Sequence, residues 1–468
     1  MKRFLWLGFV LCLYLICTGC GETFRPIIIP NPPVFPNPRA AHTVLAINDN
    51  GTVVPGSAMV VDVSGDTDMS VANVGLAPVH AVQQSASQVL VVNHSVTGAV
   101  ADSITMLSFS SVIISGTTTI SLPPDSAPNF VATTESRQAY VLLPNYAPPS
   151  FGVVSTVSNN LGPIVPVGNN PVAMVETANS QKLYVANQGD STISGFNTVD
   201  RTPRVGSPVS TTSPPIWLSA RSDSQRVYVL EGNGTLASLD TTSTAGPDTL
   251  TESAITVPGA TKMVYDGNLN RLYIPGETVV QVNGAGVLES AVMIADVSQS
   301  APSPIATIPI AAVQPSSRGA SDPCSGTAIT TLNTVDVAAL PDGSRAYVGS
   351  YYEALVNNVE YFCPQVTVID TASNTIKSSI AVPGFTAYDA FCSPSQSQRA
   401  PRFRIMMAAG GDSTRAYLSS CDGGNVNIID TSNDTYIENL PAPIGSRPPI
   451  PPDQQNPPQN PVFLIAGP

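Results

Sequence analysis

The sequence predicts an all-β fold built from one repeated unit of four short strands, and three observations predict it. Short runs of Val, Ile, Thr and Tyr alternate with clusters of Gly, Asp, Asn and Ser, which is typical of antiparallel strands and turns. Only 11 % of the 468 residues are charged, whereas Pro (44) and Gly (34) are frequent, as expected for many strands and turns. One strand motif also recurs along the chain.

This motif begins with a basic or amide residue and follows a polar turn. Its copies are QVLVVN at Gln88, RQAYVLL at Arg137, KLYVANQ at Lys182, RVYVLEG at Arg226, RLYIPGE at Arg271, RAYVGSY at Arg345 and RAYLSSC at Arg415. Six of the seven carry tyrosine at the same position, and the spacings are 50, 44, 44, 45, 74 and 70 residues. Four spacings match a four-stranded propeller blade. An apolar run precedes each copy and two follow it, so we expect strands A to D, with the motif in B, in blades one to seven.

The two ends of the chain supply the parts of one more blade. Residues 44–48, 58–63 and 69–75 read as strands B, C and D without an A strand, and residues 461–466 read as an A strand with nothing after it. Their pairing would close the ring and remove an open sheet edge. The sequence therefore predicts a single β-propeller of eight blades over residues 43–468. Seven blades would follow if the N-terminal segment is only an accessory.

The blades resemble the YVTN-repeat β-propeller family, in which a polar turn, a Tyr-Val strand and an Ile-Asp-Thr turn recur. Residues 341–384 hold all three, as PDGSRAYVGS and, after an insertion, QVTVIDTASNTIKSSIAVPG. VNIIDTSNDTYIENLP near Asp430 is a second clear copy of the later part. The resemblance covers residues 43–466 and implies the propeller fold.

Residues 1–19 have the organisation of a secretion signal. Lys2 and Arg3 precede a mostly apolar run over residues 4–16, which is too short for a comfortable transmembrane helix, and small residues precede Cys20. The segment resembles a bacterial lipoprotein signal, which implies that Cys20 is lipidated and becomes the mature N-terminus. An ordinary signal peptide cleaved nearby is the alternative. Gly21, where aspartate would retain the protein in the inner membrane, implies the outer membrane.

The segment 20–42 contains six prolines and is expected to be a semi-rigid tether. At about 3.1 Å per residue it could lift a domain about 60 Å off a bilayer. We therefore expect a protein of the bacterial cell envelope that is held on a membrane by a lipid anchor. The net charge of −13, which becomes −15 without Lys2 and Arg3, argues against a nucleic-acid partner. We also expect a monomer.

The extra length of the chain is concentrated on one face of the predicted ring. In such a ring the A–B and C–D turns lie on one face, the turn face, and the B–C and D–A loops lie on the other, the loop face. The long insertions are residues 276–289, 311–332, 350–364, 384–401 and 441–460. Almost all belong to the loop face over blades five to seven. Long loops on a rigid scaffold are where binding usually occurs, so this face is the candidate binding surface.

Four cysteines remain once the signal and Cys20 are set aside. Cys324 and Cys392 each precede an A strand, and Cys363 and Cys421 each lie between strands B and C of the same blade. Pairing Cys324 with Cys363 and Cys392 with Cys421 would give two equivalent disulfides on the loop face, in an oxidising compartment. Four cysteines allow three connectivities, and the sequence leaves the other two open. A metal site would need closer spacing or histidine partners.

Aromatic and arginine residues gather near these disulfides. The candidate binding residues are Tyr351, Tyr352, Tyr361, Phe362, Phe385, Tyr388, Phe391, Arg399 and Arg402. Such residues on a fixed surface are typical of recognition patches, so we expect a protein, peptide or glycan ligand. The alternative is that the rings pack over the disulfides as a small satellite core.

No recognised catalytic motif occurs in the chain. HExxH, GxSxG and P-loop sequences are absent, the CxxC at residues 17–20 belongs to the predicted signal and lipidation site, and the only histidines are His42, His80 and His94. The one tryptophan outside the signal, Trp217, excludes the tryptophan-per-blade pattern of quinoprotein propellers. We therefore assign no catalytic residue, metal or cofactor. The alternative is a lactonase-like or other hydrolase with a metal site at the propeller axis, a hypothesis that rests on fold analogy alone.

Overall fold

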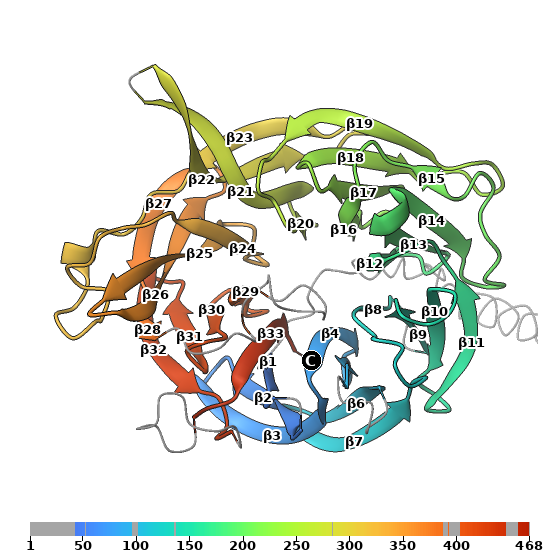
Figure 1. Cartoon of the computed structure of the whole chain (residues 1–468), viewed down its shortest axis with the longest axis horizontal. Coiled ribbons are helices and arrows are strands. Elements are labelled where there is room, and N and C mark those ends of the chain that lie inside the picture. The colour runs from blue at the N-terminus through green and yellow to red at the C-terminus, as the bar shows by residue number, and fades with distance from the viewer. Residues whose placement is uncertain are drawn as a thin grey trace, which may run out of the picture. The chain divides into compact units, whose positions relative to one another are not determined.

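Eight antiparallel sheets arranged as a ring make up the fold (Figure 1). The computed structural model describes residues 43–51, 53–95, 102–134, 137–282, 284–386, 392, 403–445 and 457–467. The chain divides into a unit Met1–Val34 and a unit Phe35–Pro468. The predicted signal, Cys20 and the tether lie outside the described residues. The second unit is an eight-bladed β-propeller, as the sequence predicts.

Each of the first seven blades takes its strands from consecutive sequence. Blades one to four consist of β4 (Pro78–Ser85), β5 (Gln88–Asn93), β6 (Ser103–Ser110) and β7 (Ile113–Ser121); β8 (Val131–Ala132), β9 (Gln138–Leu143), β10 (Ser150–Ser155) and β11 (Asn160–Pro166); β12 (Pro171–Glu176), β13 (Lys182–Asn187), β14 (Thr192–Asn197) and β15 (Val209–Ser210); and β16 (Pro215–Ala220), β17 (Arg226–Glu231), β18 (Thr235–Asp240) and β19 (Thr249–Thr256). Blades five to seven consist of β20 (Val264–Asp266), β21 (Arg271–Val282), β22 (Ala285–Asp296) and β23 (Ser303–Pro309); β24 (Asn333–Ala339), β25 (Arg345–Val356), β26 (Val359–Asp370) and β27 (Thr375–Ala381), with β28 (Phe385–Thr386) on β26; and β29 (Ile405–Ala409), β30 (Arg415–Ser420), β31 (Asn425–Asp430) and β32 (Thr435–Pro441).

The helices η1 (Gln188–Asp190) and η2 (Pro315–Ser317) are single 3₁₀ turns. None of the helices in the described residues has the length and apolar character that a bilayer crossing requires.

The closing blade joins the two ends of the described chain. It has the order β3 (Thr67–Leu76), β2 (Pro55–Asp62), β1 (Thr43–Asp49) and β33 (Asn460–Ala466). β33 runs antiparallel to β1, with Val44 opposite Ala466 and Ala46 opposite Leu464. The prediction of eight blades, with the C-terminal strand as the innermost strand of the last, is confirmed.

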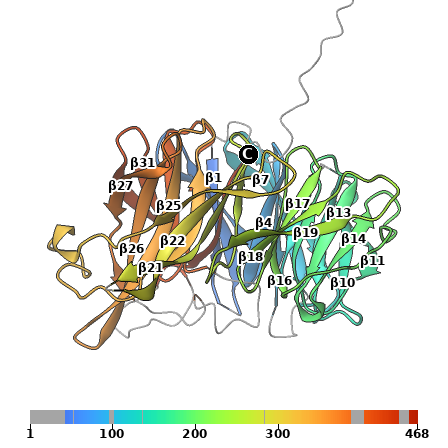
Figure 2. The ribbon, with the colours of Figure 1, turned by 90° about the horizontal axis from the view of Figure 1, so that it is seen from above.

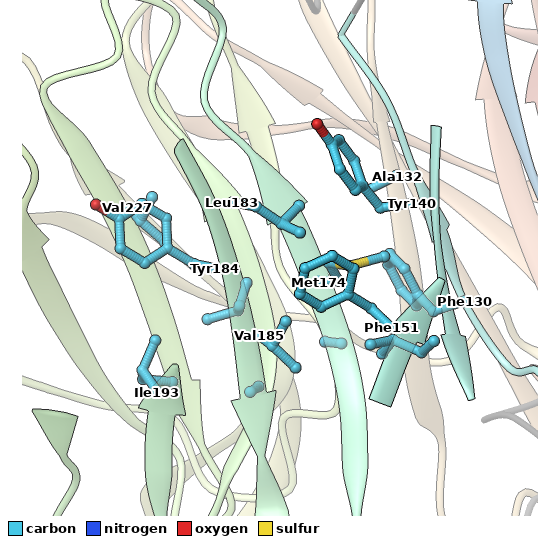
Figure 3. Close-up of a cluster of buried hydrophobic side chains, with 14 of the residues drawn as sticks. Phe130, Ala132, Tyr140, Phe151, Met174, Leu183, Tyr184, Val185, Ile193 and Val227 are labelled. Atoms are coloured by element: carbon cyan, nitrogen blue, oxygen red, sulfur yellow. The ribbon is translucent and has the colours of Figure 1, made fainter. Parts of the chain in front are cut away.

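The core lies between the blades, because both faces of each B strand are covered by neighbouring sheets. All six motif tyrosines are at most 1 % exposed. Figure 3 shows Tyr140 and Tyr184 with Phe130, Phe151 and Met174 in the cluster shared by blades two, three and four. The rings of Tyr140 and Phe151 meet edge to face with centroids 5.9 Å apart. The repeated tyrosine is therefore an interblade packing residue.

The repeated motif also explains how neighbouring blades are joined by charge. In blades three, six and seven the cation two positions before the tyrosine pairs with the carboxylate that precedes strand D of the next blade. Arg345 Nη1 lies 2.7 Å from Asp434 Oδ1, and the Tyr347 hydroxyl donates to the same oxygen at 2.6 Å. The Tyr184 hydroxyl likewise donates to Asp248 at 2.8 Å. One B strand thus supplies both a ring and a cation to the next blade.

Two insertions that the sequence predicts as loops are strands. β21 pairs with β22 as far as Val282↔Ala285, and β25 pairs with β26 as far as Val356↔Val359. Two-residue turns close both ribbons, and Asn357 and Asn358 have φ of 51° and 64°, as a type I′ turn requires. The prediction of loops at 276–289 and 350–364 was therefore wrong. Both ribbons extend outward from the ring in Figure 1, and Figure 2 shows the same blades from the side.

Candidate functional site

The candidate site is built from the two ribbons and the segment between them. We define the ribbon surface as residues 276–290, 311–332 and 350–365. The direction of the strands places this surface on the loop face. Thr43, at the start of β1, lies on the opposite face, the turn face, where its carbonyl accepts from the Gly467 N–H at 2.9 Å. The segment 311–332 touches both ribbons, because Ser290 Oγ donates to the Leu332 carbonyl and Thr330 Oγ1 donates to the Glu353 carbonyl at 2.6 Å.

Two disulfides hold this part of the loop face. Cys324 and Cys363 are joined with an S–S distance of 2.02 Å, and Cys392 and Cys421 with one of 1.99 Å. All four cysteines are fully buried. Both predicted pairings are confirmed, and the first ties the segment 311–332 to β26.

Buried polar side chains fix the same segment. The Arg318 guanidinium donates to the carbonyls of Val382 at 2.8 Å and Pro364 at 2.9 Å, and pairs with Asp322 at 3.1 Å. Gln365, fully buried, makes two hydrogen bonds to the backbone at the start of the segment. Several buried hydrogen bonds thus tie this segment to blade six, so the ribbon surface rests on a preorganised base.

Among the predicted aromatic residues that the structure describes, two are buried in that base and three are half-buried. Tyr352 and Phe362 are at most 1 % exposed. The Arg404 guanidinium lies 3.9 Å from the centroid of the Phe362 ring, and the rings of Tyr351 and Phe385 lie 5.5 and 6.0 Å from it. Tyr352 and Phe362 therefore pack as the satellite core of the alternative interpretation would. Tyr361 is half-buried in the neighbouring cluster. Tyr388, Phe391, Arg399 and Arg402 lie outside the described residues.

The exposed side chains of the ribbon surface are aliphatic, and sequence reasoning missed them. They are Val279, Val287, Leu288, Ile329, Leu355 and Val359. Leu355 is 71 % exposed and Val279 57 % exposed, both at ribbon positions. The signal that could have revealed them is the Asn-Gly at 283–284 and the Asn-Asn at 357–358, each between alternating runs, because such dipeptides mark hairpin turns.

The charges of the two ribbons are all negative. Residues 276–290 and 350–365 contain four glutamates and no lysine or arginine. The pKa of Glu353 is raised, first by burial and then by the neighbouring carboxylate of Glu360. A partner for the two ribbons would therefore meet aliphatic side chains and glutamates.

The propeller axis offers a different arrangement. His80 stacks on Phe130 with ring centroids 4.0 Å apart and approaches Phe463 at 4.6 Å. Lys262 Nζ lies 2.6 Å from Asp336 Oδ1 and 5.7 Å from the centroid of the Trp217 ring. Burial and then the Lys262 charge lower the pKa of His80 to about 3. Aromatic rings and one buried ion pair thus line the described part of the centre.

The described residues contain no group of three or more His, Cys, Asp or Glu side chains that could hold a metal ion. Asp336 is occupied by Lys262 and by the Met407 N–H at 2.9 Å. The described residues therefore offer no ligand set for the metal site of the hydrolase alternative.

Comparison with known proteins supports the fold. No family model and no curated protein matches the chain. Apo AztD from Citrobacter koseri matches with a TM-score of 0.55 and 11 % identity over 90 % of this chain and 97 % of that one. The dihydro-heme d1 dehydrogenase NirN, solved in complex with DHE, matches with a TM-score of 0.54 and 10 % identity over 86 % of this chain and 74 % of that one. At such identities the likeness concerns the fold alone.

Proposed function

We propose that this protein is an exported, lipid-anchored β-propeller that binds a protein, peptide or glycan through the ribbon surface. The observation that carries the proposal is a set of exposed aliphatic side chains, such as Leu355 and Val279, on ribbons that a disulfide and buried Arg318 hold in place. Surfaces that expose such side chains on a rigid support are typical of interaction sites. The repeated motif further supports membership of the YVTN-repeat propellers.

The anchor would be the lipid on Cys20, with the tether 20–42 leading to the propeller. β1 begins at Thr43 on the turn face, opposite the ribbon surface. The tether would therefore join the propeller on the face opposite the ribbon surface and leave that surface uncovered. This arrangement supports a ligand in the adjoining aqueous space of the bacterial cell envelope.

Anchoring is tested by replacing the predicted lipidation site. Cys20→Ser should stop incorporation of labelled fatty acid and move the protein from the outer-membrane fraction to the soluble fraction. Cys12→Ser, within the signal, is the matched control and should change neither. Unchanged labelling of the Cys20→Ser variant would contradict the anchor.

Binding is tested by site-specific photo-crosslinking in intact cells. A photoreactive amino acid at Leu355 should give a discrete adduct, whereas the same amino acid at Val199 should not. Val199 is 85 % exposed but lies in the C–D turn of blade three, on the turn face. Identical adducts at both positions, or none at Leu355, would remove the support for this surface.

A further inference from the structure

The β21–β22 ribbon presents backbone groups that point away from its own hydrogen-bond ladder. Its two-residue turn makes Val282↔Ala285 a hydrogen-bonded pair, and bonded and non-bonded pairs alternate along an antiparallel ribbon. The backbone groups of Gln281↔Gly286 and Val279↔Leu288 therefore point outward.

Two bonds at the base of the ribbon support this assignment. By the same count, the backbone of Glu277 and Ser290 points outward. The Glu277 N–H donates to the Pro258 carbonyl at 2.8 Å, and the Ser290 carbonyl accepts from the Ile310 N–H at 2.7 Å. Nearer the turn, β21 pairs only with β22 in the described chain. Both ribbon edges are thus open to another strand.

Open apolar edges are normally covered or charged, because they are templates for strand addition. Residues 278–288 contain no charged residue, no proline and no bulge in the register with the partner strand. The ribbon also stands clear of the ring in Figure 1. Its edges therefore have the features that β-strand addition uses.

The side chains add a second pattern to the edges. Residues two apart in a strand share a face. Glu277 precedes Val279 by two positions, Glu353 precedes Leu355 by two, and Glu289 follows Val287 by two. An exposed aliphatic side chain therefore stands beside a carboxylate on both ribbons.

We infer that the ribbon surface binds an extended polypeptide segment that adds as a strand to the β21–β22 ribbon and carries a basic and an aliphatic side chain two residues apart on one face. The inference rests on the proposed function and names its ligand class. A second copy of this chain would bring four glutamates against four glutamates, which is repulsive. A glycan would leave the outward amides of Val279 and Gln281 without a strand and the carboxylates without a cation.

A synthetic peptide tests the ligand class. The probe is a fluorescent peptide with blocked termini. Every second residue is Thr, and the positions between them are alternately Lys and Val, so that Lys and Val share one face of the extended peptide. The control peptide has Glu in place of Lys. Fluorescence anisotropy with the full-length protein in detergent should show binding about tenfold tighter for the Lys peptide at low salt, and a loss of that preference near 0.3 M salt. Equal binding of the two peptides would overturn the inference.

Proline variants test the strand edge. Gln281→Pro and Leu288→Pro each remove one outward N–H, on opposite edges, and leave the hydrogen bonds inside the ribbon intact. One of them should reduce peptide binding about tenfold or more, whereas Gln281→Thr, which keeps the N–H, should not. Retained binding in both proline variants, with an unchanged thermal midpoint, would exclude strand addition.

The same variants separate this inference from the proposed function. The Leu355 photo-adduct could persist while the wild type and the proline variants all bind the Lys peptide and the Glu peptide equally. In that case the surface binds something other than a basic strand. If the adduct has twice the mass of the chain, the occupant is a second copy. Either result overturns the inference and leaves the ribbon surface as a binding site.

Discussion

The Arg415 guanidinium joins the last consecutive blade to the closing blade through the carboxylate of Asp66. Arg415 Nε lies 3.0 and 2.9 Å from the two carboxylate oxygens, and Nη2 lies 2.9 Å from Oδ2. The hydrogen bond to Asp66 raises the pKa of Arg415. The two residues are 349 positions apart in sequence. This pair is a second closure of the ring, separate from the pairing of β33 with β1.

We predict that Arg415→Ala lowers the free energy of unfolding by about 1 to 2 kcal/mol, because a forked, half-buried pair is stronger than an exposed one. A double-mutant cycle with Asp66→Ala should give a coupling of about 1 kcal/mol in urea unfolding. Arg226→Ala is the control, since its carboxylate partner Asp240 lies in the same blade at 2.7 Å. A coupling of zero between Arg415 and Asp66 would contradict their role in closure.

Asp434 has more ion-pair and hydrogen-bond partners than Asp66 and should contribute more to the free energy of unfolding. Its carboxylate accepts from the Tyr347 hydroxyl and pairs with Arg345 at 2.7 Å and Lys377 at 2.8 Å, while its side chain is only 3 % exposed. Asp434→Asn should cost about 3 kcal/mol, because it leaves Arg345 without its buried counter-charge. Asparagine tolerates the φ of 59° found here, so the backbone is not the cause. Tyr347→Phe should cost only about 1 kcal/mol, and equal costs in thermal unfolding would contradict this ranking.

The blades could be predicted because six of the eight repeat one buried tyrosine at a fixed place in strand B. Tyr140, Tyr184, Tyr228 and Tyr273 recur once in each four-stranded blade. Their period alone therefore reveals the ring. Insertion length was a poorer guide. Residues 276–289 and 350–364 lengthen the blades without adding a loop, since Asn-Gly and Asn-Asn turns let β21–β22 and β25–β26 continue as ribbons.

The disulfides could be predicted from their place relative to the strands, but the depth of the aromatic residues could not. Phe362 is covered by Arg404, Tyr351 and Phe385, and Arg404 belongs to the next blade. Residue type shows that Phe362 is apolar, whereas only the packing of two blades shows that no part of it remains exposed. Exposed aliphatic residues such as Leu355 carry no distinctive sequence signal beyond the turn beside them.

The disulfide Cys392–Cys421 should support the closing strand, whereas Cys324–Cys363 should not. Cys392, Cys421 and Val462 form one buried cluster, and Asn460 Nδ2 donates to the Cys421 carbonyl at 2.7 Å. Loss of either disulfide should cost about 3.5 to 4 kcal/mol by chain entropy. Hydrogen exchange in β33 should accelerate only in the Cys392→Ser/Cys421→Ser variant. Equal exchange in both double-serine variants would contradict the contact with β33.

The buried pair Lys262–Asp336 should show the asymmetry of buried charges. The two side chains are 7 % and 1 % exposed and lie 2.6 Å apart. Lys262→Met leaves Asp336 charged and buried and should cost about 3 to 5 kcal/mol in urea unfolding. The double variant Lys262→Met/Asp336→Asn should regain a large part of that loss, because both charges are gone. A double variant less stable than Lys262→Met alone would show that Asp336 is held by its backbone donors and not by the lysine.

His80 should make the protein sensitive to mild acid. Its pKa is lowered to about 3 in the folded state against 6.5 for an ordinary histidine, chiefly by burial and further by Lys262. Between these values the unfolded state binds more protons, so stability falls as the pH drops through 6.5 toward 3. From pH 7 to pH 5 this histidine alone should remove about 2 kcal/mol. The variant His80→Gln, which keeps an acceptor for the Val131 N–H, should lose that part of the pH dependence in urea unfolding. An identical pH dependence in the variant would mean that protonation of His80 is not coupled to unfolding.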